Sequence, residues 1–129
     1  VQDQKLTARV KCLPIDVLQP AQSFLGTFDL IVSNPPYIRT DEIATLDPSV
    51  RDFEPRLALD GGQDGLDFYR AIVRNFTSAL TPKGWLCLEF GIGQENAVCS
   101  LLEQSGYEIT ELRKDTADIT RAVLARKRG

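Results

Sequence analysis

Four consecutive residues, Asn34-Pro35-Pro36-Tyr37, combine groups that can hold a planar nitrogen and pass something to it. The side-chain oxygen of Asn34 and the carbonyl of Pro35 accept hydrogen bonds, and proline has no N–H to compete with them. Two such bonds from an amide or exocyclic amine would draw electron density onto its nitrogen and fix its direction. The ring of Tyr37 can stack on the planar group and exclude water. We call these four residues the corner and predict that they bind an amide or amine.

This chemistry needs no strong base when the electrophile is already activated and the proton leaves after transfer, because positioning then supplies most of the acceleration. The chain has no histidine, which excludes Ser-His arrangements and the usual zinc sites, and we expect no metal. A structural interpretation stays open at this point, since Asn-Pro also opens ordinary tight turns after buried strands.

The corner follows residues 28–33, a short apolar run rich in strand formers. Prolines cannot continue a strand ladder, so the strand ends at the corner, and ligands of open α/β sheets bind at such carboxyl ends. A second strand-like run, 9–15, leads directly into Asp16 and Val17. After the corner comes a loop to about Gly65, and a loop of roughly thirty residues inside a domain is usually functional.

The remaining sequence alternates helices and strands. Asp64 is expected to cap a helix that residues 81–84 (Thr-Pro-Lys-Gly) end. Residues 85–90 predict a buried strand with Glu89 at its carboxyl end. Glycines at 91 and 93 predict a turn, which leads to a helix near 94–105 that ends at Gly106. Strands near 107–113 and 120–127 follow. The order predicts an α/β fold with a mainly parallel sheet and an antiparallel edge. The apolar positions with helical spacing in the first helix are Leu66, Tyr69, Ile72, Val73, Phe76 and Leu80.

Composition limits the function classes. At 129 residues the chain is one domain, and its net charge of −3 gives no basic face for direct nucleic-acid binding. Three scattered cysteines without a pairing pattern fit a reducing cytoplasm. No apolar run reaches the length of a membrane span. Because the chain does not begin with methionine, we expect it to be a piece of a longer protein.

With these residues in hand, the chain resembles the HemK/PrmC family of protein-(glutamine-N5) methyltransferases. The corner alone indicates the wider group of amino-methyltransferases that act on DNA, RNA or protein. The resemblance runs from about residue 8 to the end and rests on further matches: Ile38, 51–55 (Arg-Asp-Phe-Glu-Pro), 57–59 (Leu-Ala-Leu), 61–62 (Gly-Gly), 64–66 (Asp-Gly-Leu), 69–70 (Tyr-Arg), 88–91 (Leu-Glu-Phe-Gly) and the Asp115 to Arg121 stretch.

The resemblance implies that the parent protein uses S-adenosylmethionine to methylate a glutamine side chain in peptide chain release factors. By position, Asn34, Pro35, Pro36 and Tyr37 would form the catalytic and substrate-binding site for the glutamine amide. Asn34 would also lie near the cofactor's methyl and sulfonium group, and Asp16 and Val17 would border its adenine. Glu54 and Glu89 would support the site or serve the fold. The sequence at 61–63, Gly-Gly-Gln, is interpreted as a glycine turn before a helix.

The family's glycine-rich cofactor loop, and the acidic residue that holds the cofactor ribose, have no counterpart in this sequence. The expected fold is therefore a class I S-adenosylmethionine-dependent methyltransferase (Rossmann-like) sheet, incomplete and lacking the first two strands. Residues 1–129 would form a partial catalytic domain, the acceptor-side half, with no second domain. Without its neighbours, the 9–15 strand would pair abnormally, against the free edge of 28–33 or another chain, or stay poorly ordered. An exposed sheet edge of this kind also allows oligomers.

Two other functions remain open. A DNA or RNA adenine methyltransferase would use the same corner but needs a basic groove, against which the net charge of −3 argues. A non-catalytic fragment or interaction domain would explain the missing cofactor loop. We expect the isolated chain to bind S-adenosylmethionine weakly or not at all.

Overall fold

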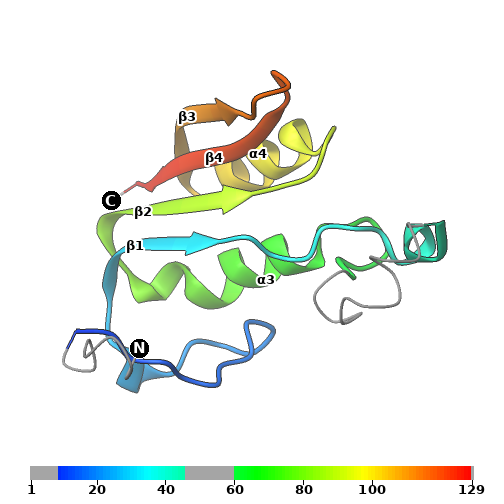
Figure 1. Cartoon of the computed structure of the whole chain (residues 1–129). Coiled ribbons are helices and arrows are strands. Elements are labelled where there is room, and N and C mark those ends of the chain that lie inside the picture. The colour runs from blue at the N-terminus through cyan, green and yellow to red at the C-terminus, as the bar shows by residue number, and fades with distance from the viewer. Residues whose placement is uncertain (1–8, 46–59, 129) are drawn as a thin grey trace.

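The computed structural model describes residues 9–45 and 60–128, which form one mixed sheet with two α-helices on one face (Figure 1). The sheet order is β1-β2-β4-β3. The strands are β1 (Phe28–Ser33), β2 (Leu80–Glu89), β3 (Tyr107–Lys114) and β4 (Thr120–Lys127), and the α-helices are α3 (Asp67–Phe76) and α4 (Glu95–Gln104). Short 3-10 helices lie at Ser23–Leu25, Thr40–Thr45 and Thr77–Ala79.

Strand directions bring several chain segments to one edge of the sheet. β1 runs parallel to β2, with Ile31 opposite Leu86, while β4 runs antiparallel to β2, with Ala122 opposite Glu89. The carboxyl ends of β1 and β2 therefore lie beside the amino end of β4. This arrangement confirms the predicted α/β sheet with an antiparallel edge and the incomplete Rossmann-like fold.

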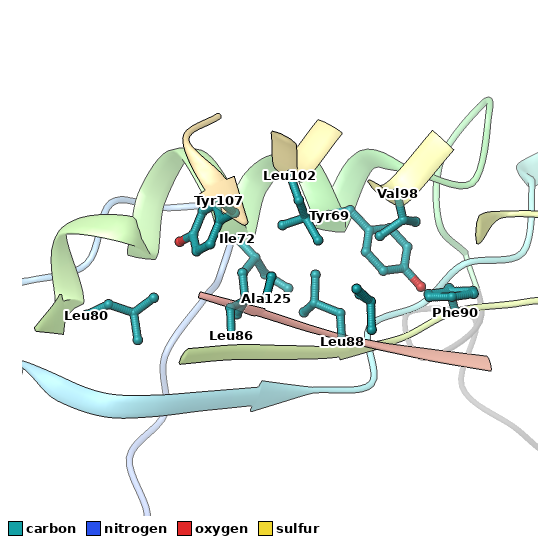
Figure 2. Close-up of a cluster of buried hydrophobic side chains, with 11 residues drawn as sticks. Tyr69, Ile72, Leu80, Leu86, Leu88, Phe90, Val98, Leu102, Tyr107 and Ala125 are labelled. Atoms are coloured by element: carbon teal, nitrogen blue, oxygen red, sulfur yellow. The ribbon is translucent and has the colours of Figure 1, made fainter. Parts of the chain in front are cut away.

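The hydrophobic core lies between the sheet and the two helices (Figure 2). Alternate residues of β2 point into it, as the two-residue period of a strand requires, and Leu88 is fully buried. Tyr69 of α3 reaches toward Phe90, and its hydroxyl donates to the carbonyl of Glu89 at 2.6 Å. The core thus fixes the end of β2, where the corner also lies. Its buried members are Tyr69, Ile72, Leu80, Leu86, Leu88, Phe90, Val98, Leu102, Tyr107, Val123 and Ala125.

The opposite face of β1 carries apolar side chains that remain in contact with solvent. Leu30 is 51% exposed and Val32 is 65% exposed, whereas Ile31, which points the other way, packs against the core. β1 is also an edge strand, because it pairs only with β2 in the described part of the chain. Burial on one face is enough to set the register of this strand.

The predicted strand at 9–15 is wrong. This segment has no regular structure, and its apolar side chains Val10, Leu13 and Ile15 are 40–50% exposed. A strand needs a partner along its length, and no described residue offers this segment one. The alternative pairing against β1 is also excluded within the described residues, since the free edge of β1 stays unpaired.

The helix signals were correct in place but wrong in two details. Asp64 does not cap α3, which begins after Leu66; its carboxylate instead accepts from the Leu66 N–H at 3.0 Å and pairs with Arg70. The expected helix end at 81–84 and the apolar position Leu80 belong to β2, which begins earlier than predicted. The end of α4 at Gly106 is confirmed: its φ of +92° favours glycine, and its N–H donates to Glu103.

Glu54 and the other sequence matches between 51 and 59 lie outside the described residues. Among the helices that are described, none has the length and apolar character needed to cross a bilayer.

Candidate active site

The corner lies where β1 ends. Asn34 is exposed, Pro35 is buried, and Tyr37 is half-buried with its ring packed against the core. Two consecutive prolines end the ladder abruptly, so the chain leaves the sheet edge in a fixed direction. The side-chain amide of Asn34 is thus exposed to solvent on a rigid stretch of backbone.

The segment after the corner is held by the returning chain before α3. Ile38 forms a parallel bridge with Asp60, and its carbonyl accepts from the Gly61 N–H at 2.7 Å. A Cβ at Gly61 would lie 2.8 Å from the Pro36 carbonyl oxygen and from the Tyr37 backbone. The two segments can approach this closely only because residue 61 is glycine. The expected glycine turn before a helix is confirmed, with Gly65 N–H donating to the Gly62 carbonyl.

A single glutamine ties three loops together behind Tyr37. The side-chain amide of Gln94 donates to the Tyr37 carbonyl at 3.0 Å and, at a longer 3.4 Å, to the Gly65 carbonyl. Its oxygen accepts from the Gly91 N–H at 2.8 Å. The Tyr37 ring lies directly against Gly91, where a Cβ would be 2.7 Å from two ring carbons.

A large cavity of about 830 Å³ opens on one side of the corner. This volume is within the range of about 300–1,000 Å³ that small-molecule sites occupy. Asp16, Val17 and Asn34, the three residues that were predicted to contact a cofactor, all line this cavity. We call it the large cavity; its full lining is Pro14, Ile15, Asp16, Val17, Leu18, Ser33, Asn34, Pro35, Pro36, Phe68 and Ile72.

The segment that carries Asp16 and Val17 is anchored to α3 by Asn75. This residue is only 7% exposed, its side-chain amide donates to the Val17 carbonyl at 2.8 Å, and its backbone carbonyl accepts from Ala21. Asp16 itself closes a turn, since its carboxylate accepts from the Leu18 N–H at 2.9 Å. One of the two carboxylate oxygens is therefore used locally.

A second, smaller cavity of about 310 Å³ also borders the corner. We call it the small cavity; it is lined by Asn34, Tyr37, Glu89, Phe90, Asp115 and Arg121. Sheet topology explains this grouping, because the carboxyl ends of β1, β2 and β3 and the amino end of β4 lie at the same end of the sheet. Glu89 is exposed at the end of β2, as predicted, and its side chain lines this cavity.

An ion pair forms one wall of the small cavity. The Nε of Arg121 lies 3.0 Å from an Asp115 carboxylate oxygen, and both side chains are about one-third exposed. Hydrogen bonds from the Ile119 N–H and then from Arg121 lower the pKa of the Asp115 carboxyl below its usual value. The pair closes the turn between β3 and β4 and fixes the guanidinium beside the corner.

The structure thus brings together around Asn34 the six residues predicted to bind substrate or cofactor: four in the corner, and Asp16 and Val17 in the lining of the large cavity. Of the two predicted supporting residues, Glu89 lines the small cavity and Glu54 lies outside the described residues. Sequence reasoning missed Gln94 and Asn75, whose side chains bridge segments 57 and 58 residues apart. The signal for Gln94 was its position directly after the Gly91 to Gly93 turn at a strand end. Within the described residues, no cluster of side chains could hold a metal ion.

Similarity to known proteins agrees with this geometry. The sequence is 44% identical to the release factor glutamine methyltransferase of Clostridium acetobutylicum over 128 residues, 99% of this chain and 45% of that protein. It is 49% identical to the release factor glutamine methyltransferase of Rhodospirillum rubrum over 109 residues, 84% of this chain and 34% of that protein. The chain therefore spans less than half the length of these relatives.

Structural similarity supports the same fold. A methyltransferase from Pyrococcus furiosus matches with a TM-score of 0.50 over 81% of this chain and 43% of that one, at 19% identity. No protein-family model matches the chain. The sheet order, the corner at its end and the extent of sequence identity agree with the predicted resemblance to the HemK/PrmC family: over most of its length the chain is similar to release factor glutamine methyltransferases, and it corresponds to less than half of their length.

Proposed function

We propose that this chain supplies the acceptor-side half of a methyltransferase domain that transfers a methyl group from S-adenosylmethionine to a glutamine side chain in a release factor. One observation carries the proposal: Asn34 lines both the large and the small cavity. A group bound in one cavity and a group bound in the other would meet at this side chain. Methyl transfer needs such a meeting point, because the donor carbon and the acceptor nitrogen must be in contact.

The small cavity is assigned to the glutamine side chain. Its amide nitrogen would donate to the Asn34 side-chain oxygen and to the Pro35 carbonyl, while the Tyr37 ring covers one face of the amide plane. These contacts orient the nitrogen lone pair toward the large cavity. As the nitrogen acquires positive charge, the same two hydrogen bonds become charge-assisted and strengthen, so the corner stabilises the transition state more than the ground state.

The large cavity is assigned to S-adenosylmethionine, which supplies an activated methyl group on a sulfonium. The lining fits part of this molecule: Val17 and its apolar neighbours suit a flat adenine, and Asn34, which also lines the small cavity, would hold the sulfonium end near the acceptor. When bound, it would supply a methyl carbon that accepts a bond from the glutamine nitrogen as the carbon–sulfur bond breaks and its electron pair stays on sulfur. The extra proton on the glutamine nitrogen would pass to water.

The proposed protein substrate is a release factor, because the relatives are named release factor glutamine methyltransferases. The proposal also places the reaction in the cytoplasm. The three cysteines support this, since all are free in the structure, with Cys12 exposed.

Methyl transfer by a chimera tests the proposal. The 128 residues that match would replace the corresponding segment of the Clostridium acetobutylicum relative, and methylation of a release factor would be followed with labelled S-adenosylmethionine. We expect an active chimera. Asn34→Ala should lower kcat about 10- to 100-fold, the effect of losing one charge-assisted hydrogen bond. Asn34→Asp retains a hydrogen-bond acceptor, so its kcat should fall less than that of Asn34→Ala.

Asn96→Ala is the matched control, because Asn96 is an exposed amide on α4 that lines neither cavity. Circular dichroism would establish that each variant is folded. A folded but inactive chimera would contradict the proposal, and so would an Asn34→Ala variant with the kcat of the parent.

A further inference from the structure

We propose that Gln94 is a positioning residue, which holds Tyr37 in the orientation that the acceptor amide requires; this inference rests on the proposed function. Gln94 does not line either cavity, so it has no place in direct substrate or cofactor binding. Its side chain instead contacts the backbone of Tyr37, a corner residue that does line the small cavity.

The geometry shows how the positioning works. Gln94 uses both ends of its amide: the nitrogen donates to the Tyr37 carbonyl and the oxygen accepts from the Gly91 N–H. The Tyr37 backbone and the Gly91 backbone are therefore fixed to the same planar group. Between them lies the Tyr37 ring, in direct contact with the bare Cα side of Gly91. The ring has no room to move toward Gly91, and the backbone carbonyl of Tyr37 is fixed by Gln94.

A glutamine is the residue that this position requires. It must donate to carbonyl oxygens on one side and accept from an N–H on the other, and at neutral pH a carboxamide of this length does both in one plane, whereas a carboxylate only accepts. A glutamate of the same length would accept from Gly91 but would face the Tyr37 and Gly65 carbonyls with a negative charge. Gln94 is also half-buried, so water replaces the lost hydrogen bonds poorly.

The position of Gln94 on the chain adds to the argument. It lies in the turn between β2 and α4, with its own N–H donating to the Gly91 carbonyl and its carbonyl accepting from Val98. The backbone of Gln94 is thus fixed by the start of α4, and its side chain hydrogen-bonds from this fixed position to Tyr37 in the corner. A side chain on a mobile loop could not hold Tyr37 in this way.

Kinetics of the chimera described above test the inference. Gln94→Met keeps the side-chain length and removes all three hydrogen bonds; we expect kcat to fall about 10- to 100-fold. The KM for S-adenosylmethionine should stay unchanged, because the large cavity is not altered. Asn96→Met is the control and should retain the parental kcat, because Asn96 carries an exposed amide in the first turn of α4.

A pH profile separates positioning from simple stability. In Gln94→Glu the new carboxyl faces two carbonyl oxygens, which favours its protonated form, and that form can donate to Tyr37 again. We expect the activity of this variant, relative to the parent, to rise as the pH is lowered. A Gln94→Met rate loss that disappears at a temperature where the variant is fully folded would overturn the inference, as would a flat relative pH profile.

Nuclear magnetic resonance of the 129-residue chain distinguishes failure of this inference from failure of the proposed function. We expect contacts between the Tyr37 ring and the Gly91 α-protons, and their loss in Gln94→Met but not in Asn96→Met. An inactive parent chimera with these contacts present would refute the function and leave the positioning intact. An active parent whose ring contacts survive Gln94→Met would refute the positioning alone.

Discussion

Gly91→Ala should destabilise the chain through one specific collision, which can be removed by a second substitution. Gly91 is buried at the end of β2, and a Cβ there would lie 2.7 Å from Cδ1 and Cε1 of the Tyr37 ring. Real Cβ contacts essentially never approach this closely, so the ring must move. The backbone of Gly91 does not have the positive φ that favours glycine, and the collision is therefore the main penalty.

The size of the effect follows from two opposing terms. Overpacking a well-packed site costs about 1–3 kcal/mol. Replacing glycine by alanine at a compatible backbone conformation returns about 0.4–1 kcal/mol, because it reduces the entropy of the unfolded chain. With mid-range values of about 2 and about 0.7 kcal/mol for the two terms, the net loss in the free energy of unfolding should be about 1.3 kcal/mol. In a Tyr37→Ala background the ring is absent, and Gly91→Ala should be neutral or stabilising.

Urea unfolding, followed by the fluorescence of Trp85, the one tryptophan, measures all four members of this double-mutant cycle. Gly93→Ala is the control: its φ of +82° makes alanine strained, but no atom lies within 4 Å of the added Cβ. Its cost, about 1–2 kcal/mol, should be the same with and without the Tyr37 ring. An equal penalty for Gly91→Ala in both backgrounds would refute the packing of Tyr37 on Gly91.

Three further predictions concern the elements around the site. Asn75→Ala should lower the free energy of unfolding by about 1–3 kcal/mol and weaken binding of a cofactor analogue to the chimera, because the Val17 carbonyl loses its buried donor; calorimetry giving parental affinity would contradict this. Asp115 has a lowered pKa in the folded state, so its stabilising effect is complete above an unfolded pKa of about 3.9 and is lost as the pH falls through the lower folded value; acid titration of stability should therefore be shallower in Asp115→Asn, and identical titrations would be the opposing result. Leu88→Ala should cost about 2–5 kcal/mol in urea unfolding, whereas Val32→Thr on the exposed face of β1 should stay within about 0.5 kcal/mol, and equal costs would show that the two faces are wrongly assigned.

Local sequence patterns predicted most of the elements. β1 was predicted to the residue and α4 to within one residue at each end, because apolar periodicity, glycine and proline act over a few residues. The first helix was predicted in the right place but too long, since α3 ends at Phe76. The strand predicted at 9–15 failed for the opposite reason. Its composition favours a strand, but a ladder depends on a neighbour that no local pattern supplies.

The candidate site shows the same division between local and distant information. The corner was identified because its four residues are contiguous and follow a strand, and Asp16 and Val17 because they follow another apolar run. Gln94 and Asn75 were missed, since each acts through a single side chain on a carbonyl more than fifty residues away. Their roles depend on the packing of three loops and not on any pattern within one segment.

The central claim is that the corner presents a glutamine amide of a release factor to an activated methyl group. Tandem mass spectrometry of a release factor, after incubation with the chimera and S-adenosylmethionine, tests this most directly. We predict one added methyl group, located on a glutamine side-chain nitrogen and formed about 10- to 100-fold more slowly when Asn34→Ala replaces the parent. A methyl group on any other residue, or one that persists unchanged in Asn34→Ala, would contradict it.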